Sequence, residues 1–256
     1  KPMQKSEALE RGLIAEIGAE LDDAYINSLK TLLVNPDAVA KAADSMKIVY
    51  TPLHGTGNKP VRRILREAGF KNVLVVPEQE LPDSEFSTVK SPNPEEKEAF
   101  ELAISLAKKE GADLIIGTDP DCDRVGVVVK SFSGEYEVLT GNQTGCLLLE
   151  YILSQMSAAG TIPNNGFVVK TIVTSELARK IAEYYNVELI EVLTGFKFIG
   201  EKIKELHETG IKKYLFGFEE SYGYLAGTFS RDKDAVVASM LICEMAAYYK
   251  NRGMSL

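Results

Sequence analysis

The sequence contains no tryptophan, two histidines and three cysteines in 256 residues. Cys122, Cys146 and Cys243 are odd in number and far apart, and no C-x-x-C pair occurs. Neither a disulfide framework nor a cysteine-rich zinc site is therefore predicted. No apolar run is long enough to cross a bilayer, and the chain does not open with a signal peptide. We expect a cytoplasmic protein with no membrane partner.

Basic residues are fewer than acidic ones: the chain has 29 lysines and arginines and 37 aspartates and glutamates, for a net charge of −8. This balance argues against nucleic-acid binding, which needs a basic surface. A small anionic substrate remains compatible with the sequence where lysines and arginines gather locally. The hydrophobic share of 45% and the charged share of 26% are those of ordinary globular proteins. The length predicts two domains.

Short apolar strands alternate with helical patterns along most of the chain. Strands are predicted near residues 47–50, 73–76, 114–116 and 125–129, with helices at 22–33, 59–68 and 95–109. A similar cycle follows from residue 142 onward. The pattern predicts an α/β protein with two similar three-layer α/β/α domains, each built on a mostly parallel mixed sheet.

The domain boundary is expected in the polar stretch after the strand at 125–129. We assign residues 1–21 to a linker from a preceding domain, 22–135 to the first domain present and 136–256 to the second. The chain begins with Lys1-Pro2 instead of an initiator methionine and stops soon after a strong helical pattern. We therefore expect a piece of a longer polypeptide.

Three carboxylates alternate in the segment from Gly117 to Arg124, between two apolar strands. In an extended backbone, alternate side chains face the same side, so Asp119, Asp121 and Asp123 should converge. Like charges held close together are costly unless a cation is present. Three carboxylates suit Mg²⁺, with waters or a phosphate completing its octahedron.

Three other interpretations of this loop compete. An EF-hand would need glycine at its sixth position and glutamate at its twelfth, but these are Arg124 and Lys130, so it is excluded. An acidic turn exposed to solvent remains open. A haloacid-dehalogenase-like phosphatase normally carries threonine or valine where this chain has Asp123.

The loop T-D-P-D-C-D-R resembles the metal loop of the α-D-phosphohexomutases, in the phosphoglucomutase branch of the phosphoglucomutase/phosphomannomutase proteins. Other segments resemble motifs of the same family in the same order. They are T-P-L-H-G-T-G at residues 51–57, S-P-N-P-E-E at 91–96, T-G-F-K-F-I-G at 194–200, G-F-E-E-S-Y-G at 217–223 and R-D-K-D at 231–234. The match covers the chain from about residue 22 and implies the family's middle domains, the second and the third.

The resemblance implies that Asp119, Asp121 and Asp123 bind Mg²⁺ and that Arg124 lies near the substrate phosphate. A salt bridge that neutralises the acidic loop is an alternative role for Arg124 and compatible with the first.

The resemblance also implies a sugar-recognition loop in which Glu219 and Ser221 bind hydroxyl groups. Thr194 and Gly195 would face the substrate at the start of a helix, where a glycine permits close approach of an anion. Lys233 is a further candidate contact. Glu220 is expected to be a solvated or structural carboxylate, His54 part of a structural turn, and Ser175 an N-cap and not a nucleophile.

The T-A-S-H-N-P loop that carries the family's catalytic phosphoserine does not occur in these residues. The resemblance therefore implies a fragment with metal and sugar loops but no catalytic residue of its own. Its partners would be a hexose phosphate and the first and fourth domains of the same polypeptide. The full-length isomerase would interconvert hexose 1-phosphate and hexose 6-phosphate, with glucose 1,6-bisphosphate as intermediate and activator.

Glucose phosphate is the expected substrate, and mannose and pentose phosphates lie within the family's range. Two other functions stay open. One is a non-catalytic module that binds sugar phosphate or metal. The other is a metal-dependent phosphatase, which would need a nucleophile within this chain.

Overall fold

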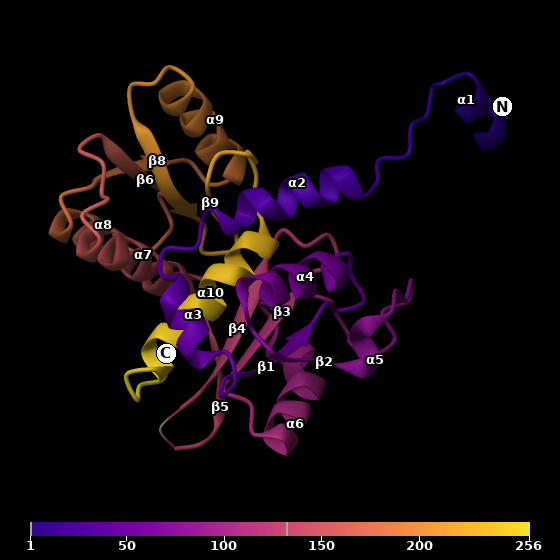
Figure 1. Cartoon of the computed structure of the whole chain (residues 1–256), viewed down its shortest axis with the longest axis horizontal. Coiled ribbons are helices and arrows are strands. Elements are labelled where there is room, and N and C mark those ends of the chain that lie inside the picture. The colour runs from indigo at the N-terminus through magenta and orange to yellow at the C-terminus, as the bar shows by residue number, and fades with distance from the viewer. Residues whose placement is uncertain (1, 132) are drawn as a thin grey trace.

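The structure is a computed structural model, and it describes residues 2–131 and 133–256. Two β-sheets lie side by side, each flanked by helices (Figure 1). The first half contains α1 (Lys5–Glu10), α2 (Ala19–Lys30), α3 (Pro36–Ala42), β1 (Lys47–Thr51), α4 (Asn58–Ala68), β2 (Asn72–Val75), α5 (Pro77–Glu80), the 3₁₀ helix η1 (Lys97–Phe100), α6 (Glu101–Glu110), β3 (Leu114–Thr118), β4 (Val125–Lys130) and β5 (Tyr136–Leu139). The second half contains α7 (Gly141–Ala158), β6 (Gly166–Thr171), α8 (Leu177–Tyr184), β7 (Glu188–Val192), α9 (Phe196–His207), β8 (Lys213–Phe218), β9 (Tyr224–Ala226) and α10 (Ala235–Lys250).

The first sheet has the strand order β2-β1-β3-β4-β5. β1 pairs in parallel with β2 and β3, whereas β3, β4 and β5 pair antiparallel. The second sheet has the order β7-β6-β8-β9, with β6 parallel to β7 and β8, and β9 antiparallel at the edge. The predicted fold class, two α/β/α domains on mixed sheets, is confirmed.

Side chains alternate between the two faces of each sheet and bury against different helices. Val49 and Ile115 pack with α6 on one face of the first sheet, and Ile48 and Ile116 pack on the other face with α4. In the second sheet, Phe167 and Val169 face α9, and Val168 faces α7 and α8. This alternation explains the three layers of each half.

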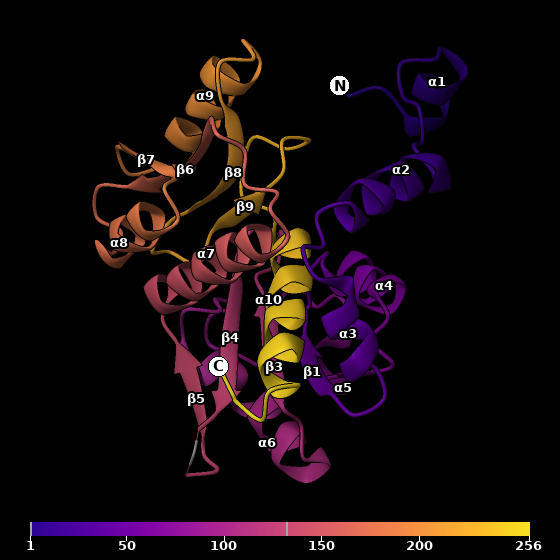
Figure 2. The same ribbon diagram turned by 60° about the vertical axis from the view of Figure 1, so that its left-hand side comes forward.

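Helix α10 comes from the end of the chain but lies between the two sheets (Figures 1 and 2). It packs on α3, α4 and β3 of the first half as well as on α7 and β9 of the second. Every residue of α10 from Ala235 to Ala247 is buried, as expected of a helix surrounded by protein on all sides. One apolar core therefore runs through both halves.

Three local expectations from the sequence differ from the structure. Strand β5 lies directly after the predicted domain boundary: residues 136–139, assigned to the second domain, are hydrogen-bonded to β4 in the first sheet. The edge strand β9 was not predicted. The helix predicted to run to Leu33 ends at Lys30, and Asn35-Pro36, expected to stop it, instead begins α3, because Asn35 caps that helix and Pro36 occupies its first turn.

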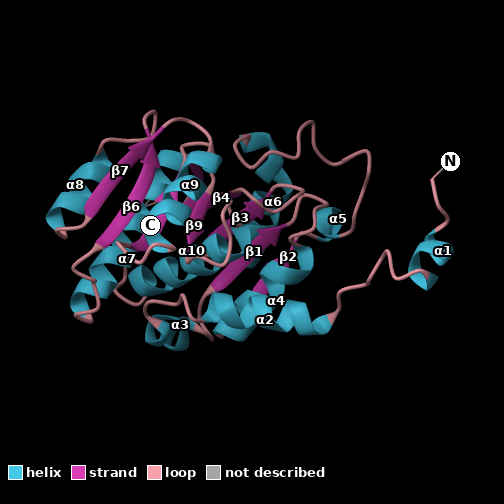
Figure 3. Cartoon of the chain, turned by 90° about the horizontal axis from the view of Figure 1, so that it is seen from above, coloured by secondary structure: helices cyan, strands magenta, loops and turns pink. Residues whose placement is uncertain are grey.

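The segment before α2 projects from the body of the molecule (Figure 3). It contains α1 and an extended stretch, and Leu13 and Ile17 are 65% and 78% exposed. None of the helices in the described residues has the length and apolar character needed to span a membrane.

Candidate functional site

The acidic loop joins β3 to β4 at the point where the first sheet changes from parallel to antiparallel pairing. One carboxylate oxygen each from Asp119, Asp121 and Asp123 lies within 4.8 Å of the others. Cys122 sits between them in a left-handed backbone conformation, with φ 62°, which tightens the turn. The convergence expected from the alternating sequence is present, and the assignment of these residues as metal ligands stays a prediction.

Asp119 is the buried anchor of this loop, with 3% of its surface exposed. Its Oδ1 accepts the backbone N–H groups of Asp123 and Arg124 at 3.0 and 2.9 Å, and its Oδ2 accepts Nε of Arg124 at 3.1 Å. Burial, reinforced by the charges of Asp123 and Asp121, raises the pKa of Asp119 to about 7, although the backbone N–H of Arg124 lowers it. A cation bound by the three carboxylates would offset this cost, so the donor set fits a hard divalent ion.

Arg124 connects the acidic loop to the segment before η1. Its Nη1 donates to Glu95 Oε1 at 3.0 Å, and its Nε lies 3.6 Å from Asp123 Oδ1. The salt-bridge role considered for Arg124 is therefore present. Its predicted contact with a phosphate remains a prediction.

Two glycines beneath the loop let the turn after β1 approach it closely. The Thr56 N–H donates to the carbonyl oxygen of Pro120 at 2.8 Å. A Cβ on Gly55 would lie 2.5 Å from Pro120 Cα, and one on Gly57 would lie 2.7 Å from Thr118 Oγ1. The turn that includes His54 therefore supports the acidic loop. This agrees with the structural role predicted for the turn.

The predicted sugar loop follows β8 and returns into β9. Glu219 is 5% exposed, and its Oε1 accepts the N–H of Gly195 at 3.1 Å. Burial raises the pKa of Glu219 even though Lys233 nearby lowers it. Thr194 and Gly195 thus lie next to the sugar loop, with Gly195 at a φ of 119° immediately before α9.

The acidic loop and the sugar loop are joined directly, although they belong to different halves of the chain. The Val125 N–H donates to the Tyr222 carbonyl oxygen at 3.2 Å, and Arg124 and Gly223 form an antiparallel bridge. Lys233 Nζ lies 2.9 Å from Asp123 Oδ2. Burial lowers the pKa of Lys233, but its ion pairs, with Asp123 above all, raise it overall.

The structure therefore brings most of the predicted residues into one region. Lys233 packs its chain within 2.2 Å of where a Cβ of Gly223 would be, so this glycine is required for the approach. Ser221 lies between Glu219 and Gly223 on the same turn and is half-buried.

Sequence reasoning did not assign a role to Glu95, which pairs with Arg124, or to Lys170 in β6. Lys170 is fully buried, and its Nζ donates to Glu176 Oε1 at 2.9 Å and Glu191 Oε1 at 2.6 Å. The lone lysine in the apolar run F-V-V-K-T was a signal in the sequence, since lysine is rarely buried unless paired.

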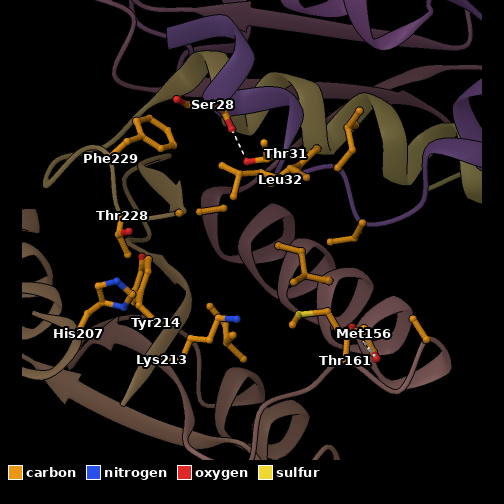
Figure 4. Close-up of a pocket in the computed structure, with 18 residues that line it drawn as sticks. Ser28, Thr31, Leu32, Met156, Thr161, His207, Lys213, Tyr214, Thr228 and Phe229 are labelled. Carbon is orange, nitrogen blue, oxygen red and sulfur yellow. Dashed lines mark hydrogen bonds between the residues drawn. The ribbon is translucent and has the colours of Figure 1, made fainter. Parts of the chain in front are cut away.

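A cavity of about 660 Å³ lies elsewhere, between α2, α7 and the edge of the second sheet (Figure 4). Leu32 and Thr31 enter it from α2, Met156 from α7, and His207 and Tyr214 from the far side. It includes none of the predicted site residues, so the acidic and sugar loops form a separate region.

Comparison with known proteins identifies the two halves of the chain. Residues 23–134 match the family model for phosphoglucomutase/phosphomannomutase, alpha/beta/alpha domain II, and residues 140–256 match the model for domain III. A phosphoglucomutase of Staphylococcus haemolyticus is 42% identical over 235 residues, covering 91% of this chain and 41% of the relative. A phosphoglucomutase of Staphylococcus aureus strain USA300 is 43% identical, covering 95% and 46%.

Solved structures of lower identity share the fold. The phosphoglucomutase parafusin from Paramecium, in its open form, matches with a TM-score of 0.64 at 19% identity, over 91% of this chain and 39% of that one. A phosphoglucomutase/phosphomannomutase family protein from Burkholderia thailandensis matches with a TM-score of 0.66 at 17% identity, over 89% and 44%. The chain spans less than half the length of these relatives. With two consecutive domain models matched in order, the chain belongs to the phosphoglucomutase/phosphomannomutase family, of which it contains domains II and III.

Proposed function

We propose that the chain supplies the Mg²⁺-binding and sugar-binding loops of an enzyme that interconverts hexose 1-phosphate and hexose 6-phosphate. The observation that carries this proposal is the direct junction of the two loops. Lys233, from the segment after the sugar loop, pairs with Asp123 of the acidic loop, and Val125 is hydrogen-bonded to Tyr222. A phosphate held at the acidic loop and a sugar held at the other loop would therefore lie side by side.

In this proposal Asp119, Asp121 and Asp123 hold Mg²⁺. The ion, when bound, supplies electrostatic stabilisation of the negative charge on a phosphoryl group in transfer. Arg124 orients the acidic loop through Asp119 and leaves part of its guanidinium available to a phosphate oxygen. Lys233 places a second positive charge between the two loops.

Glu219 and Ser221 would bind the sugar hydroxyls. A carboxylate accepts hydroxyl protons and a serine hydroxyl both donates and accepts, so the pair suits neighbouring hydroxyl groups on a ring. Glu219 is held by the N–H of Gly195, which fixes its direction. Thr194 and Gly195, at the start of α9, would line the same side of the substrate.

The remaining parts of the reaction would come from outside these residues. We propose that a phosphoserine on another domain donates its phosphoryl group, that glucose 1,6-bisphosphate is the intermediate, and that a fourth domain holds the substrate phosphate. The exposed apolar side chains of Leu13, Ile14 and Ile17 before α2 support a contact with a preceding domain, because water-exposed apolar residues in a row favour burial against a partner.

The deciding experiment uses the polypeptide with all four domains. We expect it to convert glucose 1-phosphate to glucose 6-phosphate in the presence of Mg²⁺ and glucose 1,6-bisphosphate. Release of inorganic phosphate in place of isomerisation would identify a phosphatase instead. Binding of the sugar phosphate without either product would identify a non-catalytic module.

A further inference from the structure

Glu220 stands between the two predicted sugar-binding residues, Glu219 and Ser221, yet its side chain turns to a different partner. Its Oε2 accepts the hydroxyl groups of Thr171 and Thr174, each at 3.1 Å. Glu219 instead points to Gly195. The loop is therefore held on two sides through two adjacent carboxylates.

The partners of Glu220 belong to a rigid turn after β6. Thr171 is fully buried and Thr174 is 3% exposed, and their hydroxyl groups lie 2.6 Å apart. The buried ammonium of Lys170 donates to the carbonyl oxygens of Thr171 and Thr174 at 3.4 and 3.1 Å. The Lys170 ammonium thus binds both ends of the turn, which keeps the hydroxyl groups of Thr171 and Thr174 next to each other.

A second element closes on the backbone of the same loop. Gly141, the first residue of α7, lies so near Glu220 that a Cβ there would meet the Glu220 carbonyl oxygen at 1.9 Å. Asn142, next in the helix, accepts the Ser175 N–H at 2.8 Å through its side chain. The start of α7 therefore contacts both the loop and the turn that holds it.

We propose that Glu220 is a positioning residue: its carboxylate, held by Thr171 and Thr174, fixes the backbone that presents Glu219 and Ser221 to the sugar. Hydrogen bonds to a charged acceptor are roughly twice as strong as neutral ones, so the ionised form of Glu220 is suited to this role. It does not touch the substrate. This inference rests on the proposed function of the loop in sugar binding. It adds that Glu220 holds the two sugar-binding residues in position.

The test measures amide hydrogen exchange in this chain for the wild type, for Glu220→Gln and for a control, Glu183→Gln, an exposed glutamate on α8 that pairs with Lys180. We expect the Glu220 variant to speed exchange about tenfold at the amides of Glu219 and Val125, which are bonded to the sugar loop, because a charged hydrogen bond is weakened. The control and the β1 amides should not change. Unchanged exchange at Glu219 and Val125 in a folded Glu220 variant would overturn the proposal.

Coupling provides a second arm, which also decides the matter if the Glu220 variant fails to fold. Thr171→Val with Thr174→Val should speed the same amides, and adding Glu220→Gln to that pair should change them no further. Thr171→Ser, which keeps the hydroxyl group, should behave as the wild type. Exchange at wild-type rates in the double valine variant would contradict the proposal.

Ligand binding separates this inference from the proposed function. Glucose 6-phosphate binding to the four-domain polypeptide, followed by titration calorimetry, should weaken about tenfold in the Glu220 variant, while Mn²⁺ binding at the acidic loop stays as in the wild type. Absence of glucose 6-phosphate binding in the wild type counts against the proposed function of the loop. The exchange experiment then still decides whether Glu220 positions it.

Discussion

The three acidic residues of the loop after β3 differ in exposure and hence in how they can be tested. Asp119 is buried and bonded to the backbone, so its removal would disturb the turn as well as the charge. Asp121 is exposed, and replacing its carboxylate by an amide changes the charge with little change in size.

We therefore expect Asp121→Asn to weaken Mn²⁺ binding by about tenfold or more and to remove most isomerase activity from the four-domain polypeptide. Even residues that only orient metal ligands are worth roughly 10- to 100-fold in affinity. Electron paramagnetic resonance measures Mn²⁺ binding, a coupled assay with glucose 1-phosphate measures isomerase activity, and thermal melting checks that the variant is folded. Asp44→Asn, at an exposed aspartate paired with Lys71, is the control. Normal Mn²⁺ affinity in a folded Asp121 variant would remove the metal role.

Glu219→Gln tests the other loop. Loss of one charged hydrogen bond costs roughly 1.5–3 kcal/mol, or about ten- to a hundredfold, so hexose phosphate use should fall by that factor in the four-domain polypeptide. Mn²⁺ affinity should stay unchanged. Steady-state kinetics with glucose 1-phosphate, at several Mg²⁺ concentrations, is the measurement. A shift in the Mg²⁺ requirement alone would contradict the assignment.

The acidic loop could be predicted from the sequence because its geometry is local. Alternation in an extended segment places Asp119, Asp121 and Asp123 together without reference to the rest of the fold. The contact between Asp123 and Lys233 could not be predicted in this way, because it depends on how the two halves of the chain pack. Lys233 was identified only through its resemblance to a family motif.

At the scale of elements, the turn after β1 acts as a support under the acidic loop. We expect Gly55→Ala to destabilise the chain by roughly 1–3 kcal/mol, the usual cost of overpacking, because the added Cβ would meet the backbone of Pro120 at 2.5 Å. Mn²⁺ affinity should fall with it. Gly18→Ala is the matched control, since no atom lies within 4 Å of its Cβ position. Urea unfolding compares the two, and equal midpoints would show that the loop accommodates the methyl group.

A buried carboxylate joins α10 to the start of α3. Glu244 is fully buried on α10 and accepts the backbone N–H groups of Val34 and Asn35 at 3.3 and 2.5 Å. Burial raises its pKa to about 7, although the two N–H groups lower it. Between pH 4.5 and pH 7 the folded chain therefore binds more protons at this site than the unfolded chain.

It follows that Glu244 lowers the free energy of unfolding as the pH rises through that window, by roughly 3 kcal/mol in total. Glu244→Gln should remove this contribution, so the difference in stability between variant and wild type should grow in favour of the variant from pH 5 to pH 8. Urea unfolding at several pH values measures the difference. A difference independent of pH would show that Glu244 titrates normally.

Helices and strands with a clear period were predicted from the sequence, and the short or edge elements were not. β9 has three residues and its character comes from pairing with β8, which leaves no periodic signal in the sequence. β5 has four residues and directly follows the polar stretch 131–135, whose composition marks it as a linker. Asn35-Pro36 was predicted to end the preceding helix, but α2 ends at Lys30 and this pair begins α3, because asparagine caps a helix and proline suits its first turn.

At the scale of the whole molecule, we expect the chain to fold by itself and to lack isomerase activity. The apolar core runs through both halves, so unfolding should be a single cooperative transition. Conversion of glucose 1-phosphate should not occur even with added glucose 1,6-bisphosphate and Mg²⁺, because the proposed phosphoserine lies outside these residues. Calorimetry and a coupled assay on protein freed of host mutase provide the measurements.

Isomerisation by this chain would contradict the proposal that its phosphoryl donor lies on another domain. The search for a donor would then begin with Ser175. Its N–H is held by Asn142, and its hydroxyl group accepts the Leu177 N–H at 3.2 Å in the structure.

The position of α10 has a consequence for how this protein can be divided. Its last turn is fastened to the first half by Lys250, which pairs with Asp113 at 2.6 Å, and by Asn251, which donates to the Ala38 carbonyl oxygen at 2.8 Å. A fragment ending after β5 would therefore lack α10, and the apolar surface of the first half that α10 covers would be exposed to water. Supplying the residues from α7 onward as a separate peptide should cover this surface again by complementation. The pair of domains, and not the first alone, is therefore the smallest piece of this chain expected to fold with its apolar surfaces covered.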